Sequence, residues 1–315
     1  MTDFQQTLAT ITDYIKADIF PGASLALYDG KAWQEYYQGT QDGCVPVVPG
    51  LTYDLASVSK VVGVGTLCLF YLQADKLDLD EKLSTYYPAV ENKTLTLRQL
   101  LSHSSGIDPF IPNRDELDQE GLIAAINAIK VRDDNPFLYT DINFILLGLM
   151  LEKLSGLSLD KLFDSEVFQP FGMSETQFGP VGIAVPTVKG IPGGTVHDPK
   201  ARVLKEHTGS AGLFSTLKDL EIFVNHYLTD DFAKNLTKNI SQSKKERSVA
   251  WDLQGDWILH TGYTGTFVLI NIPAQRAAIF LSNRTYYKDE RAQWIKDRDA
   301  LIEIIKEELI SEAVK

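Results

Sequence analysis

The residues of this chain best suited to covalent chemistry are a serine and a lysine three positions apart. Ser57 and Lys60 form an S-x-x-K motif at the start of an apolar stretch that reaches about Gln73. If this stretch is a helix, the serine hydroxyl lies near the positive end of the helix dipole, and the lysine lies on the same face. A partly desolvated lysine loses its proton more easily and can activate the serine as a nucleophile. The motif therefore predicts a serine hydrolase that forms an acyl-enzyme.

The S-x-x-K pattern alone is not specific, because this chain contains it four times. Lysine is common on solvated helix faces, so most such pairs have no catalytic role. Only Ser57 begins a stretch that is apolar nearly all round, where a lysine needs a specific role. The pairs set aside on this ground are Ser158/Lys161, Ser215/Lys218 and Ser241/Lys244.

A second segment, Tyr139-Thr140-Asp141, lies just before the apolar segment INFILLGLMLEKLSG. A tyrosine in a loop before a buried helix can direct its hydroxyl into a cleft, and beside a lysine it can serve as a general base. Taken alone, it is more often a packing residue, and the chain has 13 tyrosines. We predict that Lys60 and Tyr139 together transfer the proton of Ser57, and the sequence leaves open which of them is the general base.

A third segment, His260-Thr261-Gly262, lies within DWILHTGYTGTFVLINI, which is rich in β-forming residues. An edge strand beside the nucleophile can hydrogen-bond an acyl substrate, and its glycine lets the substrate approach closely. The backbone N–H of Tyr263 is then expected to join that of Ser57 in an oxyanion hole. A second copy of the motif, His207-Thr208-Gly209, is expected to lie in a loop and is set aside.

The elements expected around these residues follow the order helix, hairpin, long helical insert, several strands and final helix. The first helix covers residues 2–18, a hairpin turns at Asp29-Gly30, and four β-rich runs after residue 247 precede an amphipathic helix over the last 25 residues. Both ends of the chain can thus share one antiparallel sheet flanked by the terminal helices, an α+β fold with an inserted all-α lobe. The predicted lobes are 1–56 plus 202–315 for the sheet and 57–201 for the helices, with the active site in the cleft between them.

Local signals place several side chains outside the predicted chemistry. Thr96 with Gln99, and Thr216 with Asp219, fit helix caps, while the Gly-, Pro- and Val-rich segment 179–201 predicts a loop. Structural roles are favoured for three histidines: His103, expected to bond the loop after its own helix, and the loop residues His197 and His207.

Composition limits the partners of this protein. The chain has 315 residues and a formal net charge of -12, which repels nucleic acid phosphates and anionic lipid, so we expect a small-molecule or short-peptide substrate. Cys44 and Cys68 are the only cysteines, and neither CxxC nor HExxH occurs, so no metal site or cofactor is expected. The N-terminal residues lack the basic start and apolar core of a secretory signal, which favours a cytoplasmic protein, although a chain with its leader removed would look the same.

The order of the three motifs resembles the serine β-lactamase and penicillin-binding protein superfamily. The spacing, 82 positions from Ser57 to Tyr139 and 121 from Tyr139 to His260, is similar to the class C-like branch of class C β-lactamases, D-aminopeptidases, DD-carboxypeptidases and family VIII esterases. Further similar stretches between about residues 20 and 285 are LTLRQLLSHSSGI, YTDINFILLGLMLEKLSG, FQPFGMSETQF, SAGLFSTLKDL and HTGYTGT. The resemblance implies a β-lactamase/transpeptidase-like fold, with Ser57, Lys60 and Tyr139 as its catalytic residues.

Two residues depart from the family pattern, and both are expected to bind substrate with Thr261 and Gly262. Asp141 stands where the family has asparagine, and its carboxylate would either pair with Lys60 or hinder substrates that need an amide donor. His260 replaces the lysine with which β-lactamases hold the antibiotic carboxylate, and a largely neutral imidazole binds an anion less well. An ester or D-aminoacyl substrate is therefore favoured. The alternatives are a true β-lactamase or DD-carboxypeptidase, and a non-catalytic binding protein that retains the fold.

Overall fold

Six strands drawn from both ends of the chain form the main sheet of the computed structural model, which describes residues 4–132, 134 and 136–311. Their order is β2-β1-β9-β8-β7-β6, and every neighbouring pair is antiparallel. The predicted hairpin and the four predicted β-rich runs supply these strands, so the α+β class is confirmed. The strands are β1 (Gly22–Tyr28), β2 (Trp33–Gly39), β6 (Asp252–Gln254), β7 (Trp257–Thr261), β8 (Phe267–Asn271) and β9 (Arg276–Ser282).

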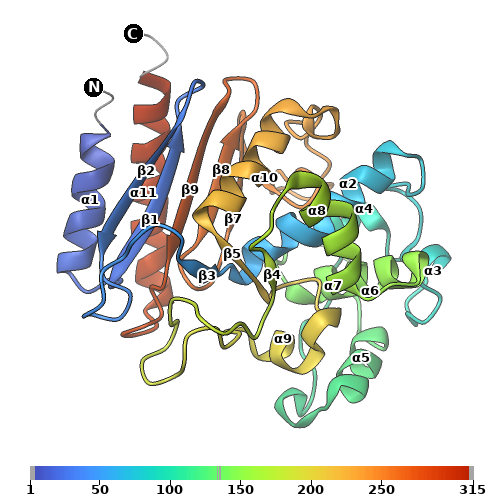
Figure 1. Ribbon diagram of the computed structural model, residues 1–315. Helices are drawn as coiled ribbons and strands as arrows, with labels where there is room; N and C mark the ends of the chain where they lie inside the picture. Colours follow the sequence, from blue (N-terminus) through green and yellow to red (C-terminus); the bar gives the residue numbers. More distant parts are fainter. Residues whose placement is uncertain (1–3, 133, 135, 312–315) are drawn as a thin grey trace.

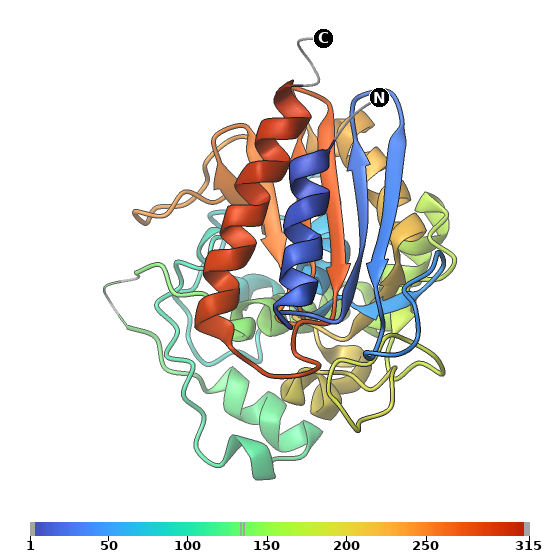
Figure 2. The same ribbon diagram turned by 90° about the vertical axis from the view of Figure 1, so that its left-hand side faces the viewer.

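The two terminal helices cover one face of this sheet, as the sequence predicts. Helices α1 (Gln5–Lys16) and α11 (Arg291–Ser311) lie side by side on that face (Figure 1, Figure 2). Between helices and sheet, the ring of Phe20 packs 5.5 Å from that of Phe280 and 5.9 Å from that of Trp294, as measured between centroids. Helix α10 (Leu217–Thr229) packs on the opposite face. Residues 2–3 and 312–315 of the predicted terminal helices lie outside the described residues.

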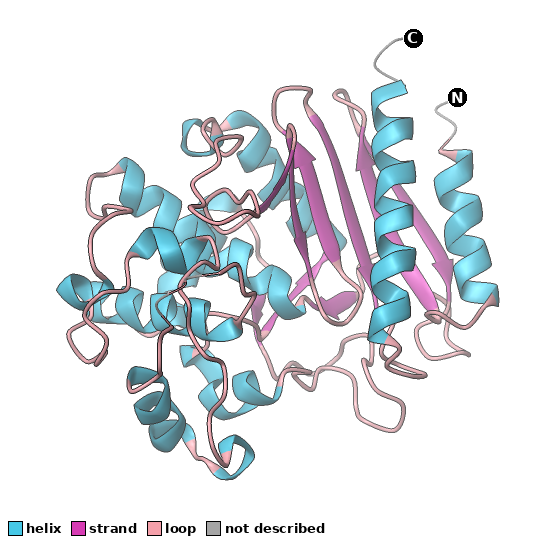
Figure 3. Cartoon of the chain, turned by 180° about the vertical axis from the view of Figure 1, so that it is seen from behind, coloured by secondary structure: helices cyan, strands magenta, loops and turns pink. Residues whose placement is uncertain are grey.

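The remaining helices gather beside the sheet, where the helical insert is expected (Figure 3). Both predicted caps are confirmed, because the Thr96 hydroxyl accepts from the Gln99 N–H, and the Thr216 hydroxyl accepts from the Asp219 N–H. The helices are α2 (Thr66–Gln73), α3 (Leu83–Tyr86), α4 (Leu97–Leu101), α5 (Gln119–Asn127), α6 (Asp141–Ser155), α7 (Leu159–Phe163), α8 (Gln169–Phe171) and α9 (Pro199–Leu204). Short helical turns are η1 (Ala56–Val58), η2 (Val61–Gly65), η3 (Arg114–Glu116), η4 (Asp164–Phe168), η5 (Lys205–His207) and η6 (Asp231–Ala233).

The segment predicted as one buried helix from Ser57 to Gln73 is helical but not uniform. It begins as the 3₁₀ turn η1, continues as the π-helical turn η2 and becomes α-helical at Thr66. The stretch Ala56–Gln73 is long and apolar enough to cross a membrane, but 78% of it is buried inside the protein. Packing in the core therefore accounts for its apolar character.

A small second sheet was not predicted. It joins β3 (Thr52–Asp54), β5 (Leu213–Thr216) and β4 (Gln177–Phe178) in the order β3-β5-β4. Strands of two to four residues are too short to show a two-residue period in the sequence. Helix α9 likewise begins within the segment 179–201, which the sequence predicts as a loop, so that prediction is wrong at its C-terminal end.

One large apolar core runs from the main sheet into the helical region. It includes Ile258 and Ile279 of the sheet together with Leu67 of α2 and Phe144 and Leu147 of α6. The small sheet also links segments assigned to different lobes, since β4 lies within 57–201 and β5 lies outside it. The exact lobe boundaries therefore stay a prediction.

Candidate active site

Ser57 lies at the turn that joins strand β3 to the buried helical segment. The residue before it, Ala56, has a φ of 45°, a left-handed conformation that a residue with a side chain keeps only when its surroundings hold it there. The Asp54 carboxylate contributes to this hold, because it accepts hydrogen bonds from the backbone N–H of Ala56 at 2.8 Å and of His197 at 2.7 Å. Ser57 itself is partly exposed and lines a cavity.

Lys60 lies directly behind Ser57 and is fully buried, with 0% exposure. Its Nζ atom donates to Ser57 Oγ at 2.8 Å, to Asp141 Oδ1 at 2.7 Å and to the Ser210 carbonyl at 2.8 Å. These three acceptors match the three N–H donors of a charged ammonium group. Burial disfavours that charge, but the Asp141 carboxylate outweighs burial and Tyr139 adds to its effect, so the pKa of Lys60 is raised. Our expectation that Lys60 loses its proton easily is therefore wrong for the resting site.

The other three S-x-x-K pairs lack this arrangement. Lys161 and Lys218 are exposed, and the Ser241 hydroxyl pairs with a neighbouring serine at 2.8 Å. Within the described part of the chain, Ser57 and Lys60 form the only one of the four pairs with a hydrogen bond between serine and lysine. Burial of the lysine thus separates this pair from the others, as the apolar context predicts.

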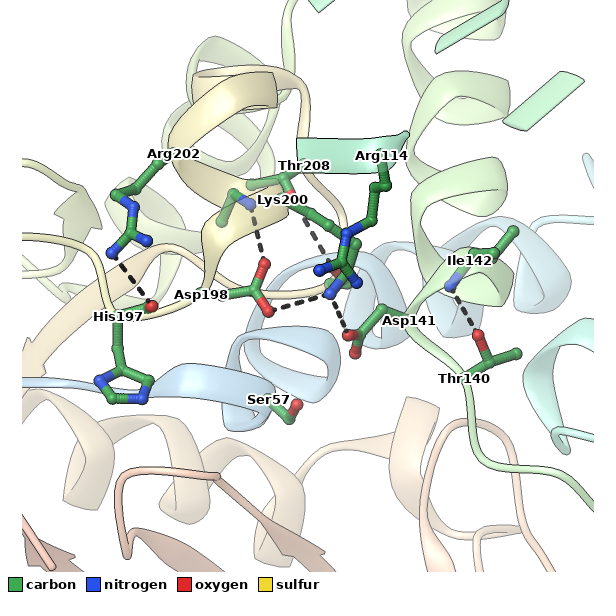
Figure 4. Close-up of polar contacts among 12 residues, drawn as sticks. Ser57, Arg114, Thr140, Asp141, Ile142, His197, Asp198, Lys200, Arg202 and Thr208 are labelled. Atoms are coloured by element: carbon green, nitrogen blue, oxygen red, sulfur yellow. Dashed lines mark hydrogen bonds and ion pairs between the residues drawn. The ribbon is translucent and has the colours of Figure 1, made fainter. Parts of the chain in front are cut away.

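Asp141 joins the buried lysine to a second cation. Its Oδ1 atom accepts from Lys60, and its Oδ2 atom lies 3.0 Å from the Nζ atom of Lys200, which also lies 3.2 Å from Asp198 Oδ2 (Figure 4). Burial opposes ionisation of Asp141, but the two ammonium groups outweigh burial and hold its pKa below the usual value. The sequence left two roles open for Asp141, pairing with Lys60 or hindering substrates that need an amide donor. The structure shows the ion pair with Lys60.

Tyr139 lies at the edge of the cavity, with 39% of its surface exposed. Its ring centroid is 5.2 Å from Lys60 Nζ and 4.3 Å from the ring of His103. His103 also fixes the backbone on both sides, because its carbonyl accepts from the Leu138 N–H at 2.9 Å and its Nδ1 atom accepts from the Thr140 N–H at 3.4 Å. His103 is therefore structural, as expected, but it bonds the loop before α6 instead of the loop after its own helix.

His260 and Thr261 end strand β7, and Gly262 follows it. His260 is 3% exposed, and within the described residues neither of its ring nitrogens has a hydrogen-bond partner. Burial, Lys60 and Arg247 all disfavour the imidazolium, so the pKa of His260 lies well below its usual value. The sequence-based expectation of a largely neutral imidazole agrees with this environment.

The expectation of an edge strand at β7 needs a correction. Strand β6 pairs with the first part of β7, through Leu259, so β7 is not an edge strand over its whole length. His260 and Thr261 extend beyond that pairing, which leaves their side of the strand unpaired by β6. Gly262 is required next to them, because a Cβ atom there would lie 2.6 Å from the Leu55 carbonyl oxygen. The unpaired end of β7 is thus held against the turn that carries Ser57.

Tyr263 lines the same cavity as Ser57, and its role as an oxyanion-hole donor stays a prediction. Within residues 4–132, 134 and 136–311, its backbone N–H donates no hydrogen bond. Its carbonyl accepts from Arg284 Nε at 2.8 Å, and its hydroxyl donates to Asp289. Its ring stacks on that of His197 at 5.5 Å, so the residue is fixed from several sides.

Two cavities meet at Tyr139, which lines both. The larger, of about 480 Å³, is also lined by Ser57, Asp141 and Tyr263. The smaller, of about 280 Å³, is lined by His260 and Thr261. The structure thus brings the predicted residues to one region, where some line the larger cavity and others line the smaller one. Lys60 and Gly262 line neither cavity.

Sequence reasoning missed the charged residues that complete both cavities. The larger cavity contains Lys200 and Asp198, and the smaller one contains Arg247 and Arg298. Arg298 Nη1 lies 3.4 Å from Thr261 Oγ1, and the Arg247 side chain is buried. Lys200 and Asp198 belong to the short helix α9 and its N-cap, Arg247 lies in a loop, and Arg298 lies in the charge-rich helix α11. No local motif distinguishes these side chains from surface charges.

Comparison with known proteins found a family profile, named relatives and solved structures that are similar to this chain. The sequence profile of the family described as Beta-lactamase matches residues 8–302. A protein of Escherichia coli (strain K12), provisionally named D-alanyl-D-alanine carboxypeptidase, is 24% identical over 81% of this chain and 75% of its own length. Among solved structures, EstCE1, a hydrolase with promiscuous acyltransferase activity, matches with a TM-score of 0.78 at 17% identity, covering 95% of this chain and 98% of that one. A class C beta lactamase from Rhodobacter sphaeroides matches with a TM-score of 0.71 at 19% identity, covering 94% and 99%.

Proposed function

Because the chain belongs to the beta-lactamase family of serine hydrolases, we propose that it cleaves an ester or amide bond through an acyl-enzyme on Ser57. The observation that carries this assignment is the 2.8 Å hydrogen bond between Lys60 Nζ and Ser57 Oγ at the wall of the larger cavity. A buried lysine in contact with a serine has a role that surface packing does not explain.

In the proposed reaction, Ser57 Oγ attacks the substrate carbonyl carbon while its proton passes to the pair formed by Lys60 and Tyr139. The backbone N–H groups of Ser57 and Tyr263 would hold the negative oxygen of the tetrahedral intermediate. The leaving alcohol or amine then takes the proton, and the carbon–oxygen or carbon–nitrogen bond breaks. Water attacks the acyl-enzyme by the reverse proton route and releases the acid.

The resting charge of Lys60 limits how this proton route can begin. The ammonium group already donates to three acceptors, so it cannot accept the Ser57 proton without first giving one up. The Lys60–Tyr139 pair must therefore lose one proton before it can act as the base. Activity is expected to rise with pH on the acidic side of the profile.

An ester or D-aminoacyl substrate is the substrate class favoured by His260. A β-lactam presents a carboxylate near the scissile bond, and a neutral imidazole gives that anion no opposite charge. A charged hydrogen bond contributes about 1.5 to 3 kcal/mol, so its loss would cost roughly ten- to a hundredfold in rate for a β-lactam. A neutral ester would not incur this loss.

The ratio of nitrocefin hydrolysis to p-nitrophenyl ester hydrolysis is expected to stay within about twofold between about pH 8 and pH 6. An ordinary histidine gains charge as the pH falls through about 6.5, which would favour the anionic substrate. His260 does not, because its pKa lies well below the usual value. The kcat/KM values of both substrates across this range would check the prediction, and a ratio that climbs severalfold on acidification would contradict it.

A second candidate, a D-alanyl-D-alanine carboxypeptidase activity, is favoured by the smaller cavity. The leaving D-alanine carries a carboxylate, and Lys245, Arg247 and Arg298 line this cavity beside Thr261. All three cations have acidic neighbours: Asp252 lies 2.7 Å from Lys245 and 3.4 Å from Arg247, and Asp299 lies 2.7 Å from Arg298. The Nε atom of Arg247 is buried and has no partner within the described residues. These cations could hold a carboxylate that His260 does not.

Replacing Arg298 with glutamine tests this second candidate. We expect kcat/KM for a peptide ending in D-alanyl-D-alanine to fall roughly ten- to a hundredfold, the loss of one charged hydrogen bond, with little change for a neutral ester. Lys296→Gln is the matched control, because Lys296 is an exposed cation of the same helix outside both cavities. An equal loss on both substrates, or no loss on the peptide, would contradict a carboxylate-binding role.

The primary proposal is tested by labelling with a fluorophosphonate, followed by mapping of the adduct by mass spectrometry. The expected adduct is on Ser57, and a label on another serine would overturn the assignment. A panel of p-nitrophenyl esters, D-aminoacyl amides and nitrocefin then identifies the preferred bond. Cytoplasmic location stays a prediction from the N-terminal sequence, and cell fractionation would test it.

A further inference from the structure

A line of alternating charges runs from the nucleophile into the wall of the larger cavity. Starting at Ser57 Oγ, it passes through Lys60 Nζ at 2.8 Å and Asp141 Oδ1 at 2.7 Å. The other oxygen of Asp141 lies 3.0 Å from Lys200 Nζ, which lies 3.2 Å from Asp198 (Figure 4). One carboxylate is thus shared by two ammonium groups.

The second ammonium group is held in place by the fold. The side chain of Lys200 is only 15% exposed, so its charge is little screened by solvent. It comes from the first turn of α9, where Asp198 Oδ1 caps the helix by accepting from the Ala201 N–H at 2.8 Å. The other oxygen of Asp198 then faces Lys200. The cap and the ion pair therefore fix Lys200 toward Asp141.

The shared carboxylate has a direct consequence for the proton of Lys60. A carboxylate that pairs with Lys60 alone would stabilise the ammonium form and oppose its use as a base. A second cation on the same carboxylate weakens that stabilisation, because it binds the opposite oxygen and repels the charge on Lys60. Lys200 therefore acts against the effect of Asp141 on the charge of Lys60.

We propose that Lys200 is a positioning residue of the active site, which shares the Asp141 carboxylate with Lys60 and so sets the pH at which the Lys60–Tyr139 pair can accept the proton of Ser57. This inference rests on the proposed function of Ser57. It does not depend on which member of the pair is the base, since a nearby cation favours loss of a proton from either side chain.

The other groups around Lys60 do not duplicate this role. His103 and His260 face it from neighbouring elements, and burial keeps the pKa of each well below its usual value, so both stay neutral. Arg247 is also a cation, but its acidic partner is Asp252 at 3.4 Å and not Asp141, so it does not share the carboxylate that pairs with Lys60. The charged and titratable groups around the ammonium of Lys60 are Tyr139, Asp141, His103, His260, Arg247, Lys200 and Asp198.

The test compares pH profiles of kcat/KM for wild type and Lys200→Met on one p-nitrophenyl ester. We expect the acidic limb of the profile, where kcat/KM rises with pH, to lie about one pH unit higher in the variant. At pH values below this limb, kcat/KM of the variant is expected to be about tenfold lower than that of wild type, and at higher pH the two are expected to agree. Lys200→Arg keeps the charge and is expected to leave the limb in place. Lys161→Met controls for removal of an exposed lysine outside both cavities.

Two further variants, expected to move the acidic limb to lower pH, keep the proposal testable if Lys200→Met does not fold. Asp198→Asn retains an oxygen for the α9 cap but removes the anion beside Lys200, so the limb is expected to move down. Asp141→Asn is expected to move it in the same direction. A folded Lys200→Met with an unmoved limb, or an Asp198→Asn limb that stays in place or moves up, would overturn the inference.

The rate of fluorophosphonate labelling at Ser57, measured across the same pH range, provides a second readout that needs no substrate. If wild-type Ser57 is not labelled, the proposed function fails. If it is labelled but the Lys200→Met profile coincides with that of wild type, only the role of Lys200 fails.

Discussion

Replacing Ser57 with alanine is expected to lower kcat roughly 10⁴- to 10⁶-fold on every substrate that the wild type hydrolyses. The hydroxyl is the only group at this position that can form the acyl bond. Among the residues that the structure describes, Lys60 bonds one other serine, Ser210, and does so through its backbone carbonyl. Fold and cavity should persist, because Ser57 is partly exposed and its side chain fills no part of the core. Steady-state turnover and fluorophosphonate labelling would measure the loss.

Ser158→Ala provides the matched control for this experiment. Ser158 also precedes a helix and has Lys161 at i+3, but its side chain makes no capping hydrogen bond and that lysine is exposed. Activity of this variant is expected to match wild type. If Ser57→Ala retains more than about one hundredth of the wild-type kcat, another nucleophile must carry the reaction.

The parts of the site that the sequence predicts are those with local causes. Ser57 and Lys60 could be chosen from four similar pairs because the stretch that follows them is apolar on every face, which marks a buried lysine. The hairpin at Asp29-Gly30 and the caps at Thr96 and Thr216 depend on neighbouring residues in the same way. Short-range patterns were sufficient for these elements.

The parts that the sequence does not predict depend on distant segments that meet only in the fold. Lys200 belongs to a helix of six residues, too short for a helical period, and its partner Asp141 lies 59 positions earlier. The charge on Lys60 is a similar case. Burial lowers the pKa of Lys60 and the ion pair with Asp141 raises it, and which effect is larger depends on the folded geometry. The small sheet is missed because none of its strands exceeds four residues.

Replacing Tyr139 with phenylalanine is expected to lower kcat/KM about 10²- to 10⁴-fold, the usual contribution of a positioned acid–base group. The hydroxyl is the only group removed, and the ring would keep its contact with His103 at 4.3 Å, so the loop before α6 should hold its position. Lys60 would remain an ammonium group with no partner to share the proton of Ser57. Both formation and hydrolysis of the acyl-enzyme should slow, since each step moves a proton by the same route.

Tyr287→Phe is the control for the loss of a phenolic hydroxyl, because Tyr287 has nearly the same exposure, 40% against 39% for Tyr139, and lines neither cavity. Its activity should equal that of wild type. Rapid mixing with a p-nitrophenyl ester separates the burst of acylation from the steady rate of deacylation in each variant. A Tyr139→Phe enzyme with both phases at wild-type rates would assign the whole proton route to Lys60. In that case the ammonium of Lys60 would have to lose its proton despite Asp141, and the cation of Lys200 on the other oxygen of that carboxylate would favour this loss.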